Sequence, residues 1–122
     1  MSAITEMLNN CFLFQGMQQQ LKTNIILAMT EKQVQSGDIV IRQGDTGDFM
    51  YIVASGIFDV FQRGADGADV PVFNYTNSGM FGERALLLDR PRAATVCAVT
   101  AGQLWALDRD ALRHFLGEGW LL

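Results

Sequence analysis

The stretch Phe81-Gly82-Glu83-Arg84-Ala85-Leu86-Leu87-Leu88-Asp89-Arg90-Pro91-Arg92-Ala93-Ala94-Thr95-Val96 is the most informative part of this 122-residue sequence. It begins with a glycine turn, continues into a short apolar segment that favours helix, and breaks at Pro91 before a strand-like segment. The first N–H groups of a helix lack partners within the helix and lie at the positive end of its dipole. A turn of this kind therefore suits an anion.

Two charged side chains add to this expected anion site. Arg92 follows the proline break, and a guanidinium matches two phosphate oxygens at once. Glu83 lies beside the first helical amides, and an ionised carboxylate can only accept hydrogen bonds, for example from the hydroxyl groups of a sugar. Ala93 and Ala94 are small, so a ligand can approach the backbone there. The pattern predicts a site for a ribose phosphate.

These residues resemble the phosphate-binding cassette of the cyclic nucleotide-binding domain family, and most closely that of cyclic AMP- and cyclic GMP-dependent protein kinases. The residues that carry the resemblance are Phe81-Gly82-Glu83, Ala85-Leu86 and Pro91-Arg92-Ala93-Ala94-Thr95-Val96. Arg84 departs from the pattern, because kinase regulatory subunits more often have an apolar residue at that position.

The resemblance implies a role for each part of the cassette. Arg92 and the backbone amides of Gly82 and Ala85 would hold the cyclic phosphate, and Glu83 would bind the ribose 2′-hydroxyl. Ala93 and Ala94 would also contact the ligand, with Phe81 and Leu86 in support. No catalytic residue, metal or cofactor is expected.

A further residue, Asp59, follows Gly56-Ile57-Phe58 in a segment that resembles the Gly-x-x-Asp-Val motif of kinase regulatory subunits. In that family the aspartate orients the phosphate-binding arginine, so the resemblance implies that Asp59 orients Arg92. The alternative is an aspartate that faces outward from a strand.

The resemblance also bears on the choice of nucleotide. In cyclic GMP-dependent kinases the residue after the phosphate arginine is often threonine, whose hydroxyl can bond the guanine 2-amino group. Ala93 offers no such group, so we expect a preference for cyclic AMP, with cyclic GMP as the alternative.

The composition indicates one globular domain, since 49% of the residues are hydrophobic. No apolar run is long enough for a bilayer and the N-terminus lacks a signal pattern, so we expect a cytoplasmic protein with no membrane partner. The net charge of -4 disfavours nucleic acid as a partner. Cys11 and Cys97 lack metal-site spacing and are expected to be reduced and buried.

The remaining sequence predicts a mainly β domain with flanking helices. Helical spacing appears at residues 3–11 and about 17–30, the latter with a stripe formed by Met17, Leu21, Ile25, Ala28 and Met29. Strands are expected at 33–35, 39–43, 49–54, 57–62, 70–75, 94–99 and 103–108, separated by glycine turns. Asp66-Gly67 is expected at a hairpin tip with a primed turn, and Asp108 is the expected N-cap of a helix at 109–116.

The family resemblance turns this element order into a specific fold. It implies one domain over residues 1–122, an eight-stranded jelly-roll-like β-barrel. The N-terminal helix-turn-helix would occupy residues 1–32, the barrel with its cassette 33–108, and the C-terminal helix 109–122. Relatives continue into a lid helix that closes over the base. Either this lid is cut off here, or Trp120–Leu122 is its first part.

Other functions were weighed against this hypothesis. Asp45-Thr46-Gly47 matches the triplet of aspartic proteases, but its polar neighbours favour an ordinary turn. His114 has no nucleophile pattern nearby, and neither a Gly-x-x-x-x-Gly-Lys loop nor a set of kinase motifs occurs. The sequence therefore predicts a non-enzymatic sensor that partners a protein kinase. The open alternatives are a sensor domain of a channel or transcription factor, and a docking module that has lost its ligand.

Overall fold

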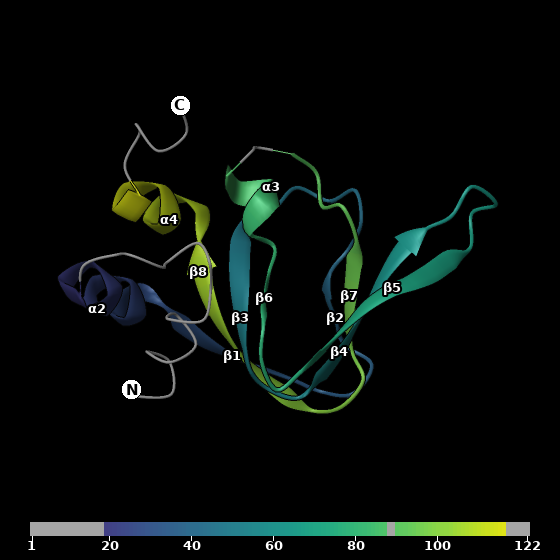
Figure 1. The fold of residues 1–122 in the computed structure, drawn as a ribbon, viewed down its shortest axis with the longest axis horizontal. Helices are drawn as coiled ribbons and strands as arrows, with labels where there is room; N and C mark the ends of the chain where they lie inside the picture. Colours follow the sequence, from purple (N-terminus) through teal and green to yellow (C-terminus); the bar gives the residue numbers. More distant parts are fainter. Residues whose placement is uncertain (1–18, 88–89, 117–122) are drawn as a thin grey trace.

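A computed structural model describes residues 19–87 and 90–116 (Figure 1). The elements, in chain order, are α2 (Gln19–Ala28), β1 (Thr30–Val34), β2 (Ile39–Ile41), β3 (Phe49–Ser55), β4 (Ile57–Arg63), β5 (Asp69–Thr76), β6 (Met80–Phe81), α3 (Glu83–Leu87), β7 (Thr95–Ala98), β8 (Gly102–Asp108) and α4 (Arg109–Leu116). The helix expected at 3–11, Met17, Cys11 and the residues 117–122 lie outside the described part.

The described strands form two antiparallel four-stranded sheets, with the orders β1-β8-β3-β6 and β2-β7-β4-β5. The two sheets face each other as a sandwich, and the β4–β5 hairpin extends beyond its edge (Figure 1). The jelly-roll-like class is confirmed, although the sandwich is not the closed barrel that the sequence analysis expected. Each described strand is paired only with strands of its own sheet, so the edges of the two sheets are not hydrogen-bonded to each other.

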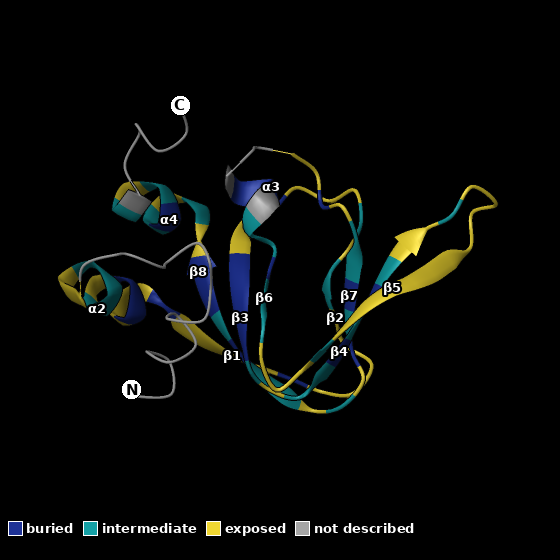
Figure 2. Cartoon of the chain, viewed as in Figure 1, coloured by how far each residue is buried: buried dark blue, intermediate teal, exposed yellow. Residues whose placement is uncertain are grey.

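Two apolar clusters lie on opposite faces of the first sheet, because side chains alternate along β3. Met50 and Ile52 point toward the helices α2 and α4, whereas Tyr51 and Val53 point into the sandwich. Figure 2 shows that this strand is buried along most of its length. Leu86 of α3 belongs to the helix-side cluster, so the cassette is packed into the same core as α4.

The expected turn glycines adopt backbone conformations that favour glycine. Positive φ angles occur at Gly37, Gly44, Gly56, Gly67 and Gly79. The hairpin tip is in the predicted place, but its turn type was predicted wrongly. Of the Asp66-Gly67 pair, Gly67 alone has a positive φ, and the N–H of Gly64 donates to the carbonyl of Ala68 at 2.7 Å. This is the geometry of a longer hairpin loop with a left-handed glycine, not of a primed two-residue turn.

Three other local predictions need correction. The helix expected to reach residue 30 ends at Ala28, because Thr30 already pairs with Ala106 in β1. Ala28 itself is exposed, and Ile26 is buried in its place. The short strand β6 was not predicted, and Cys97 is a free thiol as expected but only half-buried, because it faces outward from β7.

Asp108 caps α4 as predicted: its Oδ1 accepts a hydrogen bond from the N–H of Ala111 at 2.7 Å. Replacing this aspartate with alanine removes the cap, so Asp108→Ala should lower the free energy of unfolding by about 1 kcal/mol. Asp108→Asn should retain most of the stability, because asparagine is an equally good cap. Urea unfolding of the three proteins checks this, and equal losses in both variants would contradict a capping role.

Candidate functional site

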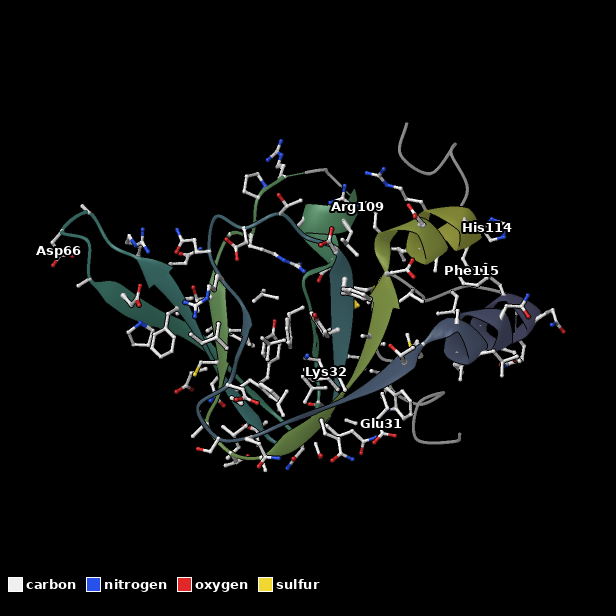
Figure 3. The ribbon with its side chains drawn as sticks, turned by 180° about the vertical axis from the view of Figure 1, so that it is seen from behind. Glu31, Lys32, Asp66, Arg109, His114 and Phe115 are labelled. Atoms are coloured by element: carbon white, nitrogen blue, oxygen red, sulfur yellow. The ribbon has the colours of Figure 1, made fainter. Side chains whose placement is uncertain are left out.

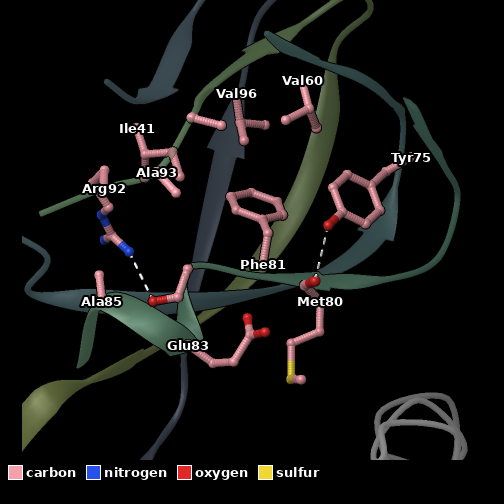
Figure 4. A pocket seen from close by; sticks show the side chains of 12 residues that line it. Ile41, Val60, Tyr75, Met80, Phe81, Glu83, Ala85, Arg92, Ala93 and Val96 are labelled. Carbon is pink, nitrogen blue, oxygen red and sulfur yellow. Dashed lines mark hydrogen bonds between the residues drawn. The ribbon is translucent and has the colours of Figure 1, made fainter. Parts of the chain in front are cut away.

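Arg92 is the centre of the candidate site. Its side chain is only 6% exposed. Nη1 donates to the carbonyl of Gly82 at 2.8 Å, and Nη2 donates to the carbonyl of Phe49 at 2.6 Å (Figure 4 shows the first bond). Because a buried charge is tolerated only when it is hydrogen-bonded, these two carbonyls hold the guanidinium in one place. Each of these nitrogens also carries a second N–H.

The backbone of Arg92 is held as well. Its N–H donates to the carbonyl of Asp45 at 2.8 Å, and its own carbonyl accepts from the N–H of Gly44 at 2.8 Å. The turn between β2 and β3 is thereby paired with the segment that leads into β7. Arg92 is therefore fixed at both ends of its side chain.

Two glycines provide the space that the guanidinium occupies. A Cβ at Gly82 would lie 2.7 Å from Nη1 of Arg92, and Gly82 has a φ of 88°. A Cβ at Gly47 would lie 2.7 Å from the Cβ of Ala85 and 3.0 Å from Cζ of Arg92. A side chain at either position would displace the arginine or the cassette helix.

The electrostatic surroundings of Arg92 are mixed. Burial lowers the pKa of its guanidinium, while the carboxylates of Asp48 and Glu83 oppose this change and the charge of Arg109 adds to it. Burial likewise raises the pKa of Tyr51, so this phenol is neutral near Arg92. An arginine stays protonated in such an environment. The site therefore presents a fixed positive charge.

A cavity of about 290 Å³ opens beside Arg92 (Figure 4). Its lining contains seven of the residues that the sequence analysis assigned to the site or its support: Phe81, Gly82, Glu83, Ala85, Arg92, Ala93 and Ala94. The rest of the lining consists of Ile41, Val60, Tyr75, Met80 and Val96. Leu86, which was assigned a supporting role, lies in the helix-side core and supports the cassette from behind.

Glu83 is the first residue of α3, and its carboxylate points toward the cavity (Figure 4). Across from it, Tyr75 donates a hydrogen bond from its hydroxyl to the carbonyl of Met80 at 3.1 Å. Burial raises the pKa of Tyr75, and the charge of Glu83 raises it further. One cavity thus holds a cation and a carboxylate on adjacent walls.

Asp59 is not placed where the resemblance implied. Its Oδ1 accepts a hydrogen bond from Nδ2 of Asn74 at 2.7 Å, on the neighbouring strand β5. Phe58 and Val60 are buried in the sandwich, so Asp59 between them faces outward. The guanidinium of Arg92 is bonded to backbone carbonyls instead. The alternative of an outward-facing strand aspartate is the one that the structure supports.

The sequence analysis missed the contribution of the turn before β3. Asp45-Thr46-Gly47 lies in the loop between β2 and β3, which turns at Arg42–Asp45, and this loop packs directly against Arg92. Asp48 follows Gly47, and its charge favours the protonated form of Arg92. The sequence feature that could have indicated this contribution is the pair Gly44 and Gly47 between two strands. Glycines so close together indicate a loop whose backbone approaches a neighbouring group closely.

Helix α4 is hydrogen-bonded to two segments that flank the site, the loop before β3 and the helix α3. Arg109 donates from Nη2 to the carbonyl of Gly47, and its N–H donates to the carbonyl of Asp48 at 2.9 Å. Arg113, one turn later, donates from Nη2 to the carbonyl of Leu86 in α3 at 3.2 Å. Figure 3 shows Arg109 at the start of α4 and the exposed His114 near its far end. His114 is a solvent-facing helix residue, as predicted.

No group of three or more metal-ligating side chains occurs within residues 19–87 and 90–116. None of the described helices has the length and apolar character required to cross a membrane.

Comparison with known proteins identifies the family of this chain. The family model described as the cyclic nucleotide-binding domain matches residues 31–118. The chain is 45% identical over 109 residues to the cAMP-dependent protein kinase regulatory subunit of Blastocladiella emersonii, covering 89% of this chain and 27% of that protein. It is 42% identical over 113 residues to the type II regulatory subunit of Drosophila melanogaster, covering 93% and 29%.

A solved structure shows the same relationship. The regulatory domain of Toxoplasma gondii PKA, co-crystallised with cAMP, matches with a TM-score of 0.89 and 37% identity, covering 93% of this chain and 43% of that one. The chain spans between a quarter and a third of the length of the two curated relatives. Because the family model covers more than half of the sequence, the chain belongs to the cyclic nucleotide-binding domain family.

Proposed function

We propose that this domain binds a cyclic nucleotide, with a preference for cyclic AMP, and regulates a cAMP-dependent protein kinase. The observation that carries the proposal is the buried guanidinium of Arg92, which two carbonyls hold beside the cavity that Glu83 also lines. The names of the relatives support the regulatory role. The partner is a kinase catalytic domain or subunit, and the setting is the cytoplasm.

The phosphate end of the ligand lies between Arg92 and the start of α3. The second N–H groups of the guanidinium face a phosphate oxygen, and the amides of Gly82 and Ala85 approach it from the helix side. Ala93 and Ala94 are small and lie on the cavity wall, so they leave room for the ring of the cyclic phosphate. Burial has already removed most of the water around the guanidinium of Arg92, so an anion that binds here displaces little water.

The ribose end lies at Glu83. A carboxylate accepts hydrogen bonds, and the 2′-hydroxyl of a ribonucleotide is a donor. Phe81 lies beneath this part of the cavity and Tyr75 beside it. This arrangement distinguishes a ribonucleotide from an inorganic phosphate, which has no sugar hydroxyl to reach Glu83 while the phosphate is bound at Arg92.

Regulation follows from the ties between the site and α4. A phosphate that changes the position of α3 or of the turn at Gly47 changes the carbonyls that Arg113 and Arg109 bind. A ligand shifts such an equilibrium only through contacts that differ between two states. The domain is a binding module and not an enzyme in this proposal.

Two alternatives stay open. A sensor of a channel or a transcription factor would use the same ligand contacts. Flanking transmembrane segments would identify a channel, and a flanking helix-turn-helix would identify a transcription factor. A docking module without ligand would keep the fold but not bind nucleotide. The similarity to kinase regulatory subunits favours the kinase assignment.

Arg92→Ala should weaken cyclic AMP binding at least about thirtyfold, because losing the partner of a charged group in a desolvated site costs about 2–5 kcal/mol. Arg92→Lys should not restore binding, since an ammonium lacks the forked geometry. Titration calorimetry measures both. Arg63→Ala, which removes an exposed arginine on the hairpin, is the control. Native affinity in Arg92→Ala, with folding verified by thermal unfolding, would refute the site.

Variants of Asp48 and Asp59 test whether the resemblance assigned the correct role to Asp59. Asp48→Asn should leave cyclic AMP affinity unchanged or raise it slightly, because Arg92 stays protonated without this carboxylate and the bound anion loses a nearby negative charge. Asp59→Asn should leave the affinity unchanged, because Asp59 is paired with Asn74 on the outer face. A clear loss of affinity in Asp59→Asn would restore the role of Asp59 as the residue that orients Arg92.

Ala93 tests the choice between the two nucleotides. If the base folds over the ribose, guanine has no acceptor for its 2-amino group here, and a buried unpaired donor costs about 1–3 kcal/mol. Native protein should therefore prefer cyclic AMP, and Ala93→Thr should raise cyclic GMP affinity by about 1 kcal/mol, or roughly fivefold. Parallel titrations with both nucleotides measure this. A native preference for cyclic GMP that the added hydroxyl does not change would favour the cyclic GMP alternative.

A further inference from the structure

Two further cavities lie next to each other along the loop that holds Arg92. The first, of about 270 Å³, is bounded by the loop between β2 and β3 and by Arg92 itself. The second, of about 320 Å³, lies at the start of α4. Asp48 and Phe49 line both cavities, and the two cavities together are named the Phe49 groove. Phe49 is 39% exposed between them, although its side chain is large and apolar.

Most of the exposed charges of the Phe49 groove are negative. Asp45 and Asp48 line the first cavity, and Asp48, Asp108 and Asp110 line the second. All four side chains are exposed. Among the residues that the structure describes, none of the four forms an ion pair. These carboxylates are therefore available to a cation from outside the chain.

The arginines of the groove leave these carboxylates unpaired. Arg92 is buried and donates to two backbone carbonyls. Arg109 is half-buried, and its Nη2 donates to the carbonyl of Gly47. Arg42 is exposed, so the exposed charges of the groove are four carboxylates and one guanidinium. This balance favours a cationic binding partner.

Tyr51 supplies a buried polar group at the first cavity. Its side chain is only 8% exposed, and it lines this cavity. Its hydroxyl forms no hydrogen bond with any residue in the described ranges 19–87 and 90–116. A buried hydroxyl without a partner is costly, and a phenol oxygen can accept a hydrogen bond from an N–H group. Tyr51 thus points independently to a ligand that donates hydrogen bonds inside the cavity.

Other occupants fit these features less well. A metal ion is disfavoured, because no group of three or more metal-ligating side chains occurs in the described part of the chain. A second copy of this chain carries a net charge of -4 and would be repelled by the carboxylates. A purely apolar segment would contact Phe49 but would bury carboxylates without a partner. A basic segment satisfies the carboxylates, the hydroxyl and the exposed ring together.

We propose that the Phe49 groove is a docking surface for a basic segment of a partner protein. One arginine or lysine side chain enters the first cavity between Asp45 and Asp48 and donates to the hydroxyl of Tyr51. Its aliphatic part lies on the ring of Phe49, as long cationic side chains commonly do on apolar surfaces. A second basic side chain lies in the cavity at the start of α4. This binding requires no nucleotide, so the inference goes beyond the proposed function and does not depend on it.

The carboxylates are tested with a fluorescein-labelled tetra-arginine peptide, whose anisotropy is measured with the native chain at low salt and without nucleotide. The double variant Asp45→Asn, Asp48→Asn should weaken binding by about twofold to thirtyfold, the range for two exposed ion pairs. The control is the double variant Asp66→Asn, Asp69→Asn, which makes the same change of charge at the exposed hairpin tip and should bind like the native chain. A native chain that does not bind the peptide, or equal losses in both double variants, would overturn the proposal.

Insertion of a side chain into the first cavity is tested with Tyr51→Phe. This variant should weaken tetra-arginine binding by about two- to tenfold, the range of one hydrogen bond. Thr76→Val, which removes an exposed hydroxyl on β5, should keep the native affinity. Thermal unfolding verifies that both variants are folded. Native affinity in a folded Tyr51→Phe would overturn the placement of a basic side chain in this cavity.

The second cavity is tested with Asp110→Asn in the same assay. Because Asp110 lies at the start of α4 and away from the loop before β3, its loss removes an ion pair that the first double variant retains. Peptide affinity should fall by about one and a half- to fivefold, the range for one exposed ion pair. An unchanged affinity would overturn the binding of a second basic side chain there.

Discussion

Arg92 is buried as a cation, and much of the surrounding structure consists of groups that make this burial possible. The carbonyls of Gly82 and Phe49 accept from its guanidinium, and the carbonyl of Asp45 accepts from its backbone N–H. These acceptors come from the cassette, from β3 and from the turn before β3. One residue thus joins the cassette to β3 and to the turn before it, which are distant from Arg92 in the sequence. An anion that binds here meets a donor that needs little reorganisation, which is how a preformed site gains affinity.

The same arrangement connects the site with the core. Leu86 packs among the buried residues of α2, α4 and the first sheet, while its carbonyl accepts from Arg113. Arg109 binds the turn that supports Arg92. Helix α4 therefore makes hydrogen bonds to the turn before β3 and to α3, and it also packs against Leu86 of α3 in the apolar core. A change in the position of the cassette or of this turn would therefore change the hydrogen bonds of α4.

The cassette and most strands could be predicted from the sequence because their signals are local. Gly82, Glu83 and Arg92 lie within one short stretch, and alternation of apolar residues marks β2, β4 and β8. The support for Arg92 could not be predicted, because the carbonyl of Phe49 lies 43 residues away and a backbone acceptor has no sequence signature. Asp59 was misassigned by resemblance, although the apolar neighbours Phe58 and Val60 already indicated that it faces outward. The closed barrel was wrong because edge pairing depends on geometry that periodicity does not encode.

The most direct test of the central claim is a crystal structure of this chain bound to cyclic AMP. The account predicts that the exocyclic phosphate oxygens bind Arg92 and the amides at the start of α3, and that the 2′-hydroxyl binds Glu83. The bonds of Arg92 to Gly82 and Phe49 should persist, because the site is preformed. A phosphate bound away from Arg92, or a guanidinium that leaves both carbonyls to reach it, would contradict the account.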